Sequence, residues 1–357
     1  MQKVENKNNG IALISIITIL FTGINGLITY IFLTLLSSVE FGRDPEIKHG
    51  IAKGSSRLGG LVILCSVVFG VLFNLHFFSK LSFINVTQEF DSIILFSILV
   101  GLIGLAEDFT QKLSSTIRLK IMFLFVLLAL IAMPQLVPND LPMFNIDGFV
   151  IHQIFVFLVT LVLICGFINA GNIADGANGL LAGTYLSFFI ILYSFDSSVF
   201  NFSMLTTLTA FIIYNASTGR IFLGDFGSYL LSTIVAFKSL EIYLLFDVPV
   251  FFLASILIYP CFELIRSLLN RLANKNSLMS PDNYHLHNYV NSYLLRFKFS
   301  KHMANSMTGL GIAVISSVPL ILYFNDIVST WLYFFMFEFF LLCLFYLLLG
   351  KINLKKI

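Results

Sequence analysis

Acidic side chains stand at the ends of several long apolar segments of this sequence, far apart along the chain. They are Glu107 and Asp108, then Asp175, then Asp225 and finally Asp282. Carboxylate oxygens without an organised set of cysteine or histidine ligands favour Mg²⁺ or Mn²⁺ over Zn²⁺. Because Mg²⁺ usually completes its coordination shell with phosphate oxygens and water, the pattern predicts a metal site that acts on a phosphate or pyrophosphate.

Basic residues and glycines accompany these acids. Lys112, Arg118 and Lys120 follow the first acidic pair, and Arg220 precedes Asp225, so cationic side chains are at hand for further phosphate oxygens. Nearby glycines would let backbone N–H groups approach the same oxygens. Each pattern alone also has a plain structural explanation, since Asp-Gly pairs are common in turns and acids are common at helix starts. Their occurrence together favours one shared site.

The elements that must position these groups are apolar helices. Hydrophobic residues make up 58% of the 357 residues and charged residues only 11%, against about 25% charged in a typical soluble domain. A lipid core of about 30 Å needs about 20 apolar helical residues to cross it. Eleven segments are therefore predicted to span a membrane: 11–36, 58–78, 92–105, 117–133, 151–168, 180–195, 203–214, 229–246, 248–265, 308–324 and 328–349.

The positions of the positive charges orient these segments. Most of the 21 lysines and arginines fall in loops on the same side as residues 37–57, which the positive-inside rule makes cytoplasmic. The N-terminus is then outside and the C-terminus cytoplasmic, and all the acids named above lie on the cytoplasmic side. We expect one transmembrane domain over residues 1–357, with residues 266–307 as a cytoplasmic loop subdomain. A net charge of +2 without a basic domain gives no basis for a nucleic-acid partner.

Two pairs of opposite charges lie in or beside the apolar segments. Lys238 and Glu241, and Glu263 and Arg266, are each spaced i, i+3, which places both members of a pair on one helix face. Mutual neutralisation within a helix bundle is the expected role of both pairs.

Four stretches of the chain carry a family resemblance. They are residues 57–60 (Arg-Leu-Gly-Gly), residues 169–180 around Asp175-Gly176, residues 219–228 around Gly224-Asp225, and residues 281–287 (Pro-Asp-Asn-Tyr-His-Leu-His). In order and spacing they resemble the polyprenyl-phosphate N-acetylhexosamine-1-phosphate transferase family, which includes the phospho-MurNAc-pentapeptide translocase. The resemblance implies that a UDP-sugar and undecaprenyl phosphate react, with Mg²⁺, to give undecaprenyl-diphospho-sugar and UMP.

The same resemblance implies roles for individual residues. The catalytic group is Glu107, Asp108 and Asp175, the metal ligands are Asn172 and Asp225, the nucleotide and sugar contacts are Asn178, Asp282, His285 and His287, and the phosphate contacts are Arg57, Arg118, Lys120 and Arg220. Of the acidic pair we favour Asp108, because the family has Asp where this chain has Glu107. Asn178 occupies a position that is often Asp in the family. The family's His and prolines ahead of Arg57 are also missing from this chain.

The implied setting is the bacterial cytoplasmic membrane, crossed several times, with the active site facing the cytoplasm and a cell-envelope glycan such as O-antigen as the downstream product. UDP-sugar, undecaprenyl phosphate and the bilayer are the implied partners, and a homodimer is left open. A one-step attack by the lipid phosphate and a two-step route through a carboxylate nucleophile both fit. A polytopic transporter and an inactive family member acting as a scaffold are the alternatives, although carriers tend to bind substrate near the bilayer midplane and often contain repeats, which this sequence lacks.

Overall fold

Helices make up nearly all of the secondary structure in the described part of this chain. The computed structural model describes residues 2–39, 43, 55–78, 92–139, 149–275, 277 and 284–354. Within these residues the β-type pairings are two isolated bridges, from Arg43 to Ser56 and from Ser56 to Ile221. The predicted all-α fold class is confirmed for this part of the chain.

In chain order the elements are α1 (Gln2–Ser38), α2 (Gly59–Phe78), α3 (Ser92–Thr110), α4 (Ser115–Ala132), the short 3₁₀ turn η2 (Pro134–Leu136), α5 (Phe149–Ala174), α6 (Leu180–Phe195), α7 (Val199–Thr218), α8 (Gly224–Phe246), α9 (Val250–Ile256), α10 (Ile258–Ala273), α11 (Leu286–Leu295), α12 (Lys301–Ser316), α13 (Val318–Phe324) and α14 (Trp331–Leu354). Each of the eleven predicted segments falls on one of these helices or on two consecutive ones.

Fewer of these helices than expected are long enough to cross a membrane. Eight described helices meet the length and hydropathy of a span, and a ninth results if α9 and α10 count as one bent span. The described parts of α2 and α6 are shorter apolar helices. The chain is thus a polytopic membrane protein with eight or nine candidate spans in its described part, where the sequence predicted about eleven.

The predicted segment 248–265 is not straight. α9 and α10 meet at Leu257 with a bend of 78°. Pro260 lies in the first turn of α10. Because proline has no backbone N–H, it cannot donate a hydrogen bond to a carbonyl group of α9. Helix α10 loses no hydrogen bond, since the first N–H groups of a helix have no partner within it. The bend carries α10 away from the direction of α9.

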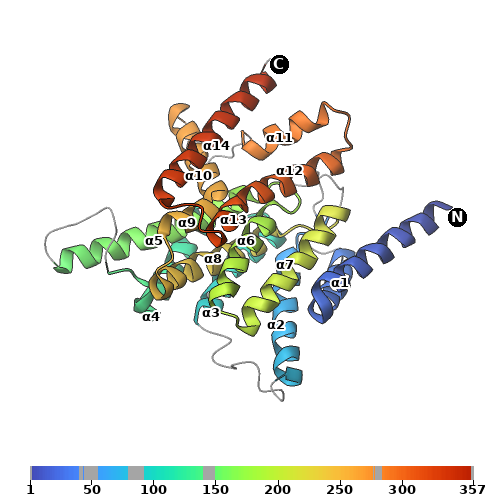
Figure 1. Cartoon of the computed structure of the whole chain (residues 1–357), viewed down its shortest axis with the longest axis horizontal. Coiled ribbons are helices and arrows are strands. Elements are labelled where there is room, and N and C mark those ends of the chain that lie inside the picture. The colour runs from blue at the N-terminus through green and yellow to red at the C-terminus, as the bar shows by residue number, and fades with distance from the viewer. Residues whose placement is uncertain are drawn as a thin grey trace.

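Helix α8 forms the centre of the bundle. It lies in the middle of Figure 1 and packs against α2, α3, α5 and α6. Its residues from Phe226 to Lys238 are all buried, as expected for a helix that is surrounded by other helices. By contrast, α14 exposes Phe337, Phe340 and Leu347 along its length, which suits contact with lipid.

Two close backbone contacts fix the start of α8. A Cβ on Gly104 of α3 would lie 2.3 Å from the carbonyl oxygen of Asp225, and one on Gly60 of α2 would lie 2.2 Å from Cα of Gly227. Backbone hydrogen bonds also join the two strand-like segments before α2 and α8, from Ser56 N to Arg220 O (2.9 Å) and from Phe222 N to Ser56 O (2.8 Å). The beginnings of α2 and α8 and the end of α3 therefore meet at one place.

Candidate active site

A cavity of about 260 Å³ opens where these helix ends meet. Of the residues predicted for the site, its wall contains Arg57, Glu107, Asp108, Arg118, Asn172, Asp175, Asn178 and Asp225. They come from the start of α2, the end of α3, the start of α4, the end of α5 with the turn after it, and the start of α8. These are all helix ends that the predicted topology assigns to the cytoplasmic side. Four of the five acids named from the sequence, Glu107, Asp108, Asp175 and Asp225, thus line one cavity.

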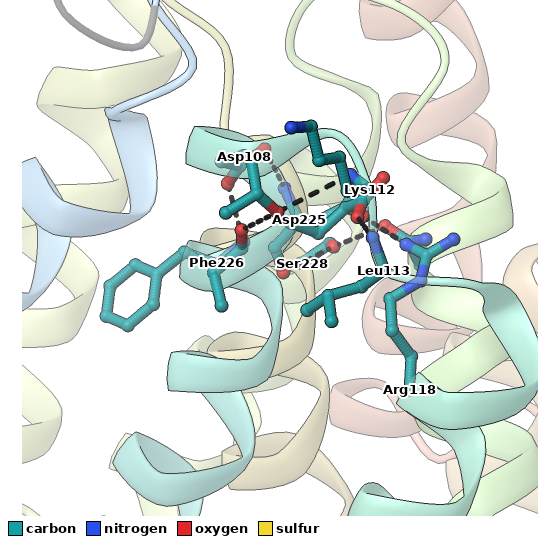
Figure 2. Close-up of polar contacts among 11 residues, drawn as sticks. Asp108, Lys112, Leu113, Arg118, Asp225, Phe226 and Ser228 are labelled. Carbon is teal, nitrogen blue, oxygen red and sulfur yellow. Dashed lines mark hydrogen bonds and ion pairs between the residues drawn. The ribbon is translucent and has the colours of Figure 1, made fainter.

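Asp108 holds the first turn of α8. Its Oδ1 accepts the backbone N–H of Asp225 at 3.1 Å and its Oδ2 accepts that of Phe226 at 3.0 Å, as Figure 2 shows. A carboxylate at this position satisfies two free N–H groups and interacts favourably with the positive end of the helix dipole. Gly224 has a φ of +71°, and a Cβ there would lie 2.7 Å from Asp108 Oδ2 and 2.2 Å from the carbonyl oxygen of Arg57. Glycine at 224 therefore makes this contact possible.

Asp225 pairs with Arg118. The guanidinium Nη1 of Arg118 reaches from α4 to Oδ2 of Asp225, and both side chains keep some exposure to the cavity (Figure 2). Ser228, one turn further along α8, places its hydroxyl 2.7 Å from Oδ1 of Asn172 and 3.2 Å from the carbonyl oxygen of Asp225. The two predicted metal ligands, Asn172 and Asp225, are thus connected through one serine.

Asp175 differs from the other acids of the cavity. It follows the last residue of α5, and its carboxylate makes no hydrogen bond or ion pair with another of the described residues. Burial, together with the nearby negative charges of Asp225 and Asp108, raises the pKa of Asp175 to about 8. Without a cation in the cavity, this carboxyl group favours its neutral form at neutral pH.

The donor types of this cavity suit a magnesium ion. Asp175, Asp225 and Asn172 offer carboxylate and amide oxygens, the ligands that Mg²⁺ and Mn²⁺ prefer. Among the described residues, no three histidine, cysteine or acidic side chains are already grouped as a set of metal ligands. Arg118 would have to release Oδ2 of Asp225 before that oxygen could bind an ion.

The other residues predicted for the site from the sequence lie in different places. Glu107 lines the cavity, but its Oε2 accepts the backbone N–H of Leu113 at 2.9 Å and so closes the turn between α3 and α4. Lys120 is exposed on α4 and Arg220 is half-buried before α8, and neither is part of the cavity wall. Asp282 lies outside the described residues.

Asn178 connects the cavity to α12. Its backbone N–H donates to Oδ1 of Asn305 at 2.7 Å, and its Nδ2 donates to the hydroxyl of Ser306 at 3.2 Å. Asn305 lines the cavity as well, although no motif in the sequence marked it. Its position within the polar stretch 266–307 was the one available signal.

His285 and His287 stand at the start of α11, with their rings stacked 5.2 Å apart. His287 lies directly on the turn after α5, because a Cβ on Gly176 would be 2.0 Å from its Nε2. Burial lowers the pKa of His287 to about 4, so this imidazole is neutral at neutral pH. The predicted sugar-binding histidine therefore packs behind Gly176, the residue after Asp175 in the cavity wall, and is not itself part of that wall.

Comparisons with known proteins agree with the motifs. The family model Glycosyl transferase family 4 matches residues 90–243, which include Asp108, Asp175 and Asp225. The phospho-N-acetylmuramoyl-pentapeptide-transferase of Dictyoglomus thermophilum is 28% identical over 291 residues, covering 73% of this chain and 87% of the relative. The undecaprenyl-phosphate alpha-N-acetylglucosaminyl 1-phosphate transferase of Thermotoga maritima is 26% identical over 272 residues, covering 75% of this chain and 80% of the relative. The family resemblance is thereby confirmed: residues 90–243 match glycosyl transferase family 4, and the chain is a distant homologue of these transferases.

Proposed function

We propose that this chain transfers a sugar 1-phosphate from a UDP-N-acetylhexosamine to undecaprenyl phosphate, releases UMP and so starts a cell-envelope glycan. The main support is the single cavity in which Asp108, Asp175, Asp225, Arg57 and Arg118 meet. Such a reaction must bring a soluble nucleotide sugar to a lipid headgroup, and the helix ends around this cavity share one side in the predicted topology. The family assignment supports the same class of reaction.

The reaction needs alignment and charge neutralisation more than it needs a base. In the one-step form, an oxygen of the lipid phosphate attacks the sugar-bearing phosphorus, the bond from that phosphorus to the UMP oxygen breaks, and UMP leaves with the electron pair. A phosphate monoester has a second pKa of about 6, so the nucleophile is largely dianionic at pH 7. Arg57 and Arg118 in the cavity wall can hold the two anions together.

The acids of the cavity then have different tasks. Mg²⁺ held by Asp175, Asp225 and Asn172 would neutralise charge on the diphosphate. Arg118, once released from Asp225, has a phosphate oxygen as its next partner. Asp108 uses both oxygens to hold the start of α8. If the reaction takes two steps, Asp175 is the cavity carboxylate best suited to be the nucleophile, because it has no partner among the described residues.

The surroundings of the site follow from this assignment. We place the chain in the bacterial cytoplasmic membrane with the cavity facing the cytoplasm, as one domain over residues 1–357 that includes residues 266–307 as a cytoplasmic part. A homodimer stays a prediction.

A direct assay tests the proposal. Purified protein is incubated with undecaprenyl phosphate, Mg²⁺ and a panel of radiolabelled UDP-sugars, and lipid-borne label and released UMP are measured. We expect one UDP-N-acetylhexosamine to give both products, EDTA to abolish them, and Asp225→Asn to remove them while leaving the protein folded. Absence of both products with every UDP-sugar would refute the proposed reaction, and full activity in EDTA would remove the metal from it.

A further inference from the structure

A second buried acid, outside the cavity, is held by an unusual number of polar groups. Glu263 of α10 has no exposed surface, although α10 runs toward the cytoplasmic side of the predicted topology. Its Oε1 accepts the backbone N–H of Leu286 at 2.6 Å and the hydroxyl of Tyr259 at 3.3 Å. Its Oε2 accepts from Nε of Arg266 at 3.1 Å and lies 2.9 Å from Nδ1 of His285. The carboxylate therefore joins its own helix to the start of α11.

The ion pair with Arg266 alone does not explain this arrangement. Neutralising a charge within α10 requires only the i, i+3 pair, whereas the contacts to His285 and Leu286 reach a segment more than 20 residues away. A buried carboxylate costs several kcal/mol of desolvation unless its partners are well placed. An apolar residue at 263 would avoid that cost, so the acid has value chiefly for what it fixes at the start of α11.

The segment that Glu263 holds, at the start of α11, is connected to the cavity. The hydroxyl of Tyr259, which contacts Glu263, also lies 2.9 Å from Nδ1 of His287. His287 in turn packs on Gly176, next to Asp175 in the cavity wall. A continuous path of contacts thus runs from Glu263 through Tyr259 and His287 to the turn that carries Asp175.

We infer that Glu263 is a positioning residue for the nucleotide-sugar end of the reaction: it holds residues 285–287 against the Asp175-Gly176 turn, so that this turn keeps its place in the wall that receives the donor. This inference rests on the proposed function for its substrate, and it assigns Glu263 no contact with the reacting atoms.

The test compares Glu263→Gln with Glu241→Gln, a matched control. Glutamine keeps one oxygen for Leu286 but turns an NH₂ group toward Arg266 and His285, which themselves point nitrogen atoms at this position. Glu241 is also the acid of an i, i+3 ion pair, with Lys238 at 2.6 Å, but it does not line the cavity. We expect Glu263→Gln to raise KM for the UDP-sugar about tenfold with KM for undecaprenyl phosphate unchanged, Glu263→Asp to recover part of that loss, and Glu241→Gln to stay within about twofold of the parent.

Hydrogen exchange gives a readout that does not depend on turnover. In Glu263→Gln, the amides of residues 284–290 and 174–179 should exchange at least tenfold faster than in the parent, with the rest of the chain unchanged. Gly176→Ala provides a second route, because the added Cβ would displace His287 without touching Glu263; it should raise KM for the UDP-sugar in the same way. If Glu263→Gln does not fold, the same kinetic and exchange measurements on Glu263→Asp decide, and unchanged values in both would overturn the positioning role.

The outcomes separate the inference from the proposed function. Unchanged exchange in Glu263→Gln would overturn the positioning role, as would faster exchange with unchanged KM for the UDP-sugar, or equal rises in both KM values. If the parent protein transfers no sugar at all, the proposed function fails, and calorimetric binding of UDP to the parent and to Glu263→Gln replaces the kinetic comparison. Equal UDP affinity, or no binding by either protein, would then overturn the inference.

Discussion

Helices α8 and α11 begin in the same way but with opposite charge balance. Each has a carboxylate from another helix at its first N–H groups, Asp108 of α3 for α8 and Glu263 of α10 for α11. Glu263 is fully enclosed and has Arg266 and other polar groups around both oxygens. Asp108 stands beside two further acids, Asp175 and Asp225, in an open cavity.

This difference indicates that Glu263 supports the fold, whereas the carboxylates of the cavity are placed to bind a ligand. Around Glu263 the polar groups already satisfy the charge, so a change there should act through position. The cavity wall carries four acids and two arginines, Arg57 and Arg118, so acidic groups are in excess there. An excess of this kind favours the binding of a cation together with an anionic substrate.

After the complete loss expected for Asp225→Asn, the largest effect is expected for Asp175→Asn. This change removes a cavity carboxylate that has no partner among the described residues, so it should lower the transfer rate on the order of 10²–10³-fold. Folding should not suffer, because an uncharged amide relieves the repulsion by Asp225 and Asp108. Transfer assays and thermal unfolding in detergent measure the two properties, and a variant that keeps more than a tenth of the activity would contradict the role given to this acid.

The second prediction concerns pH and Mg²⁺. Because the pKa of Asp175 rises from its ordinary 3.8 to about 8, the folded chain keeps a proton that the unfolded chain loses, and the metal-free protein should lose stability as pH rises from about 4 to 8. A bound cation replaces that proton. The stabilisation by Mg²⁺ should therefore grow from pH 5 to pH 8, toward about 2.7 kcal/mol at a hundred times Kd.

Unfolding temperatures with and without Mg²⁺ across this range measure the effect, and Asp175→Asn serves as the control that should flatten it. A Mg²⁺ stabilisation that is the same at pH 5 and pH 8 would show that Asp175 does not share the ion.

A third change examines the start of α8. Asp108→Ala removes the acceptor for two backbone N–H groups and should cost about 1–2 kcal/mol of unfolding free energy, whereas Asp108→Asn keeps an acceptor and should cost less. Denaturant or thermal unfolding compares the two variants. The transfer rate of the stable Asp108→Asn variant distinguishes a structural from a chemical role. A loss of more than a hundredfold would mean that the negative charge of Asp108 takes part in the reaction.

The smallest effect is expected on the side of α11. Tyr259→Phe removes one hydroxyl between Glu263 and His287 and should cost about 1 kcal/mol of stability. It should raise KM for the UDP-sugar by less than Glu263→Gln does, because the contacts of Glu263 with Leu286 and His285 remain. An effect larger than that of Glu263→Gln would place the tyrosine, and not the acid, at the centre of the cluster.

The sequence predicted where the apolar helices and the acids of the cavity lie, because both depend on local patterns, but it predicted more membrane spans than the eight or nine candidates of the described part. Long apolar runs indicate membrane helices independently of the helices that pack against them. Positive charges at the ends of these runs indicate which side of the membrane each end faces. Eight of the predicted site residues, from Arg57 to Asp225, line the cavity. The 78° bend after α9 was not predicted, because hydropathy records composition and not direction.

Partners within the site could not be predicted from local patterns. Nothing near Asp108 in the sequence indicates that it accepts hydrogen bonds from residues 225 and 226, and nothing near Glu263 indicates that it reaches His285. Asn305 was missed for the same reason, since its contact with Asn178 joins positions 127 residues apart. Long-range contacts of this kind depend on how the helices pack.

The glycine contacts at the start of α8 restrict how this protein can change. Any side chain at position 60 or 104, even a methyl group, would collide with backbone atoms, which cannot rotate aside as a side chain can. The collision would push α2 or α3 off the central helix and pull Asp108 away from the first turn of α8. Two positions that carry no chemistry of their own are thus as intolerant of replacement as the acids, because the missing atoms there hold the site together.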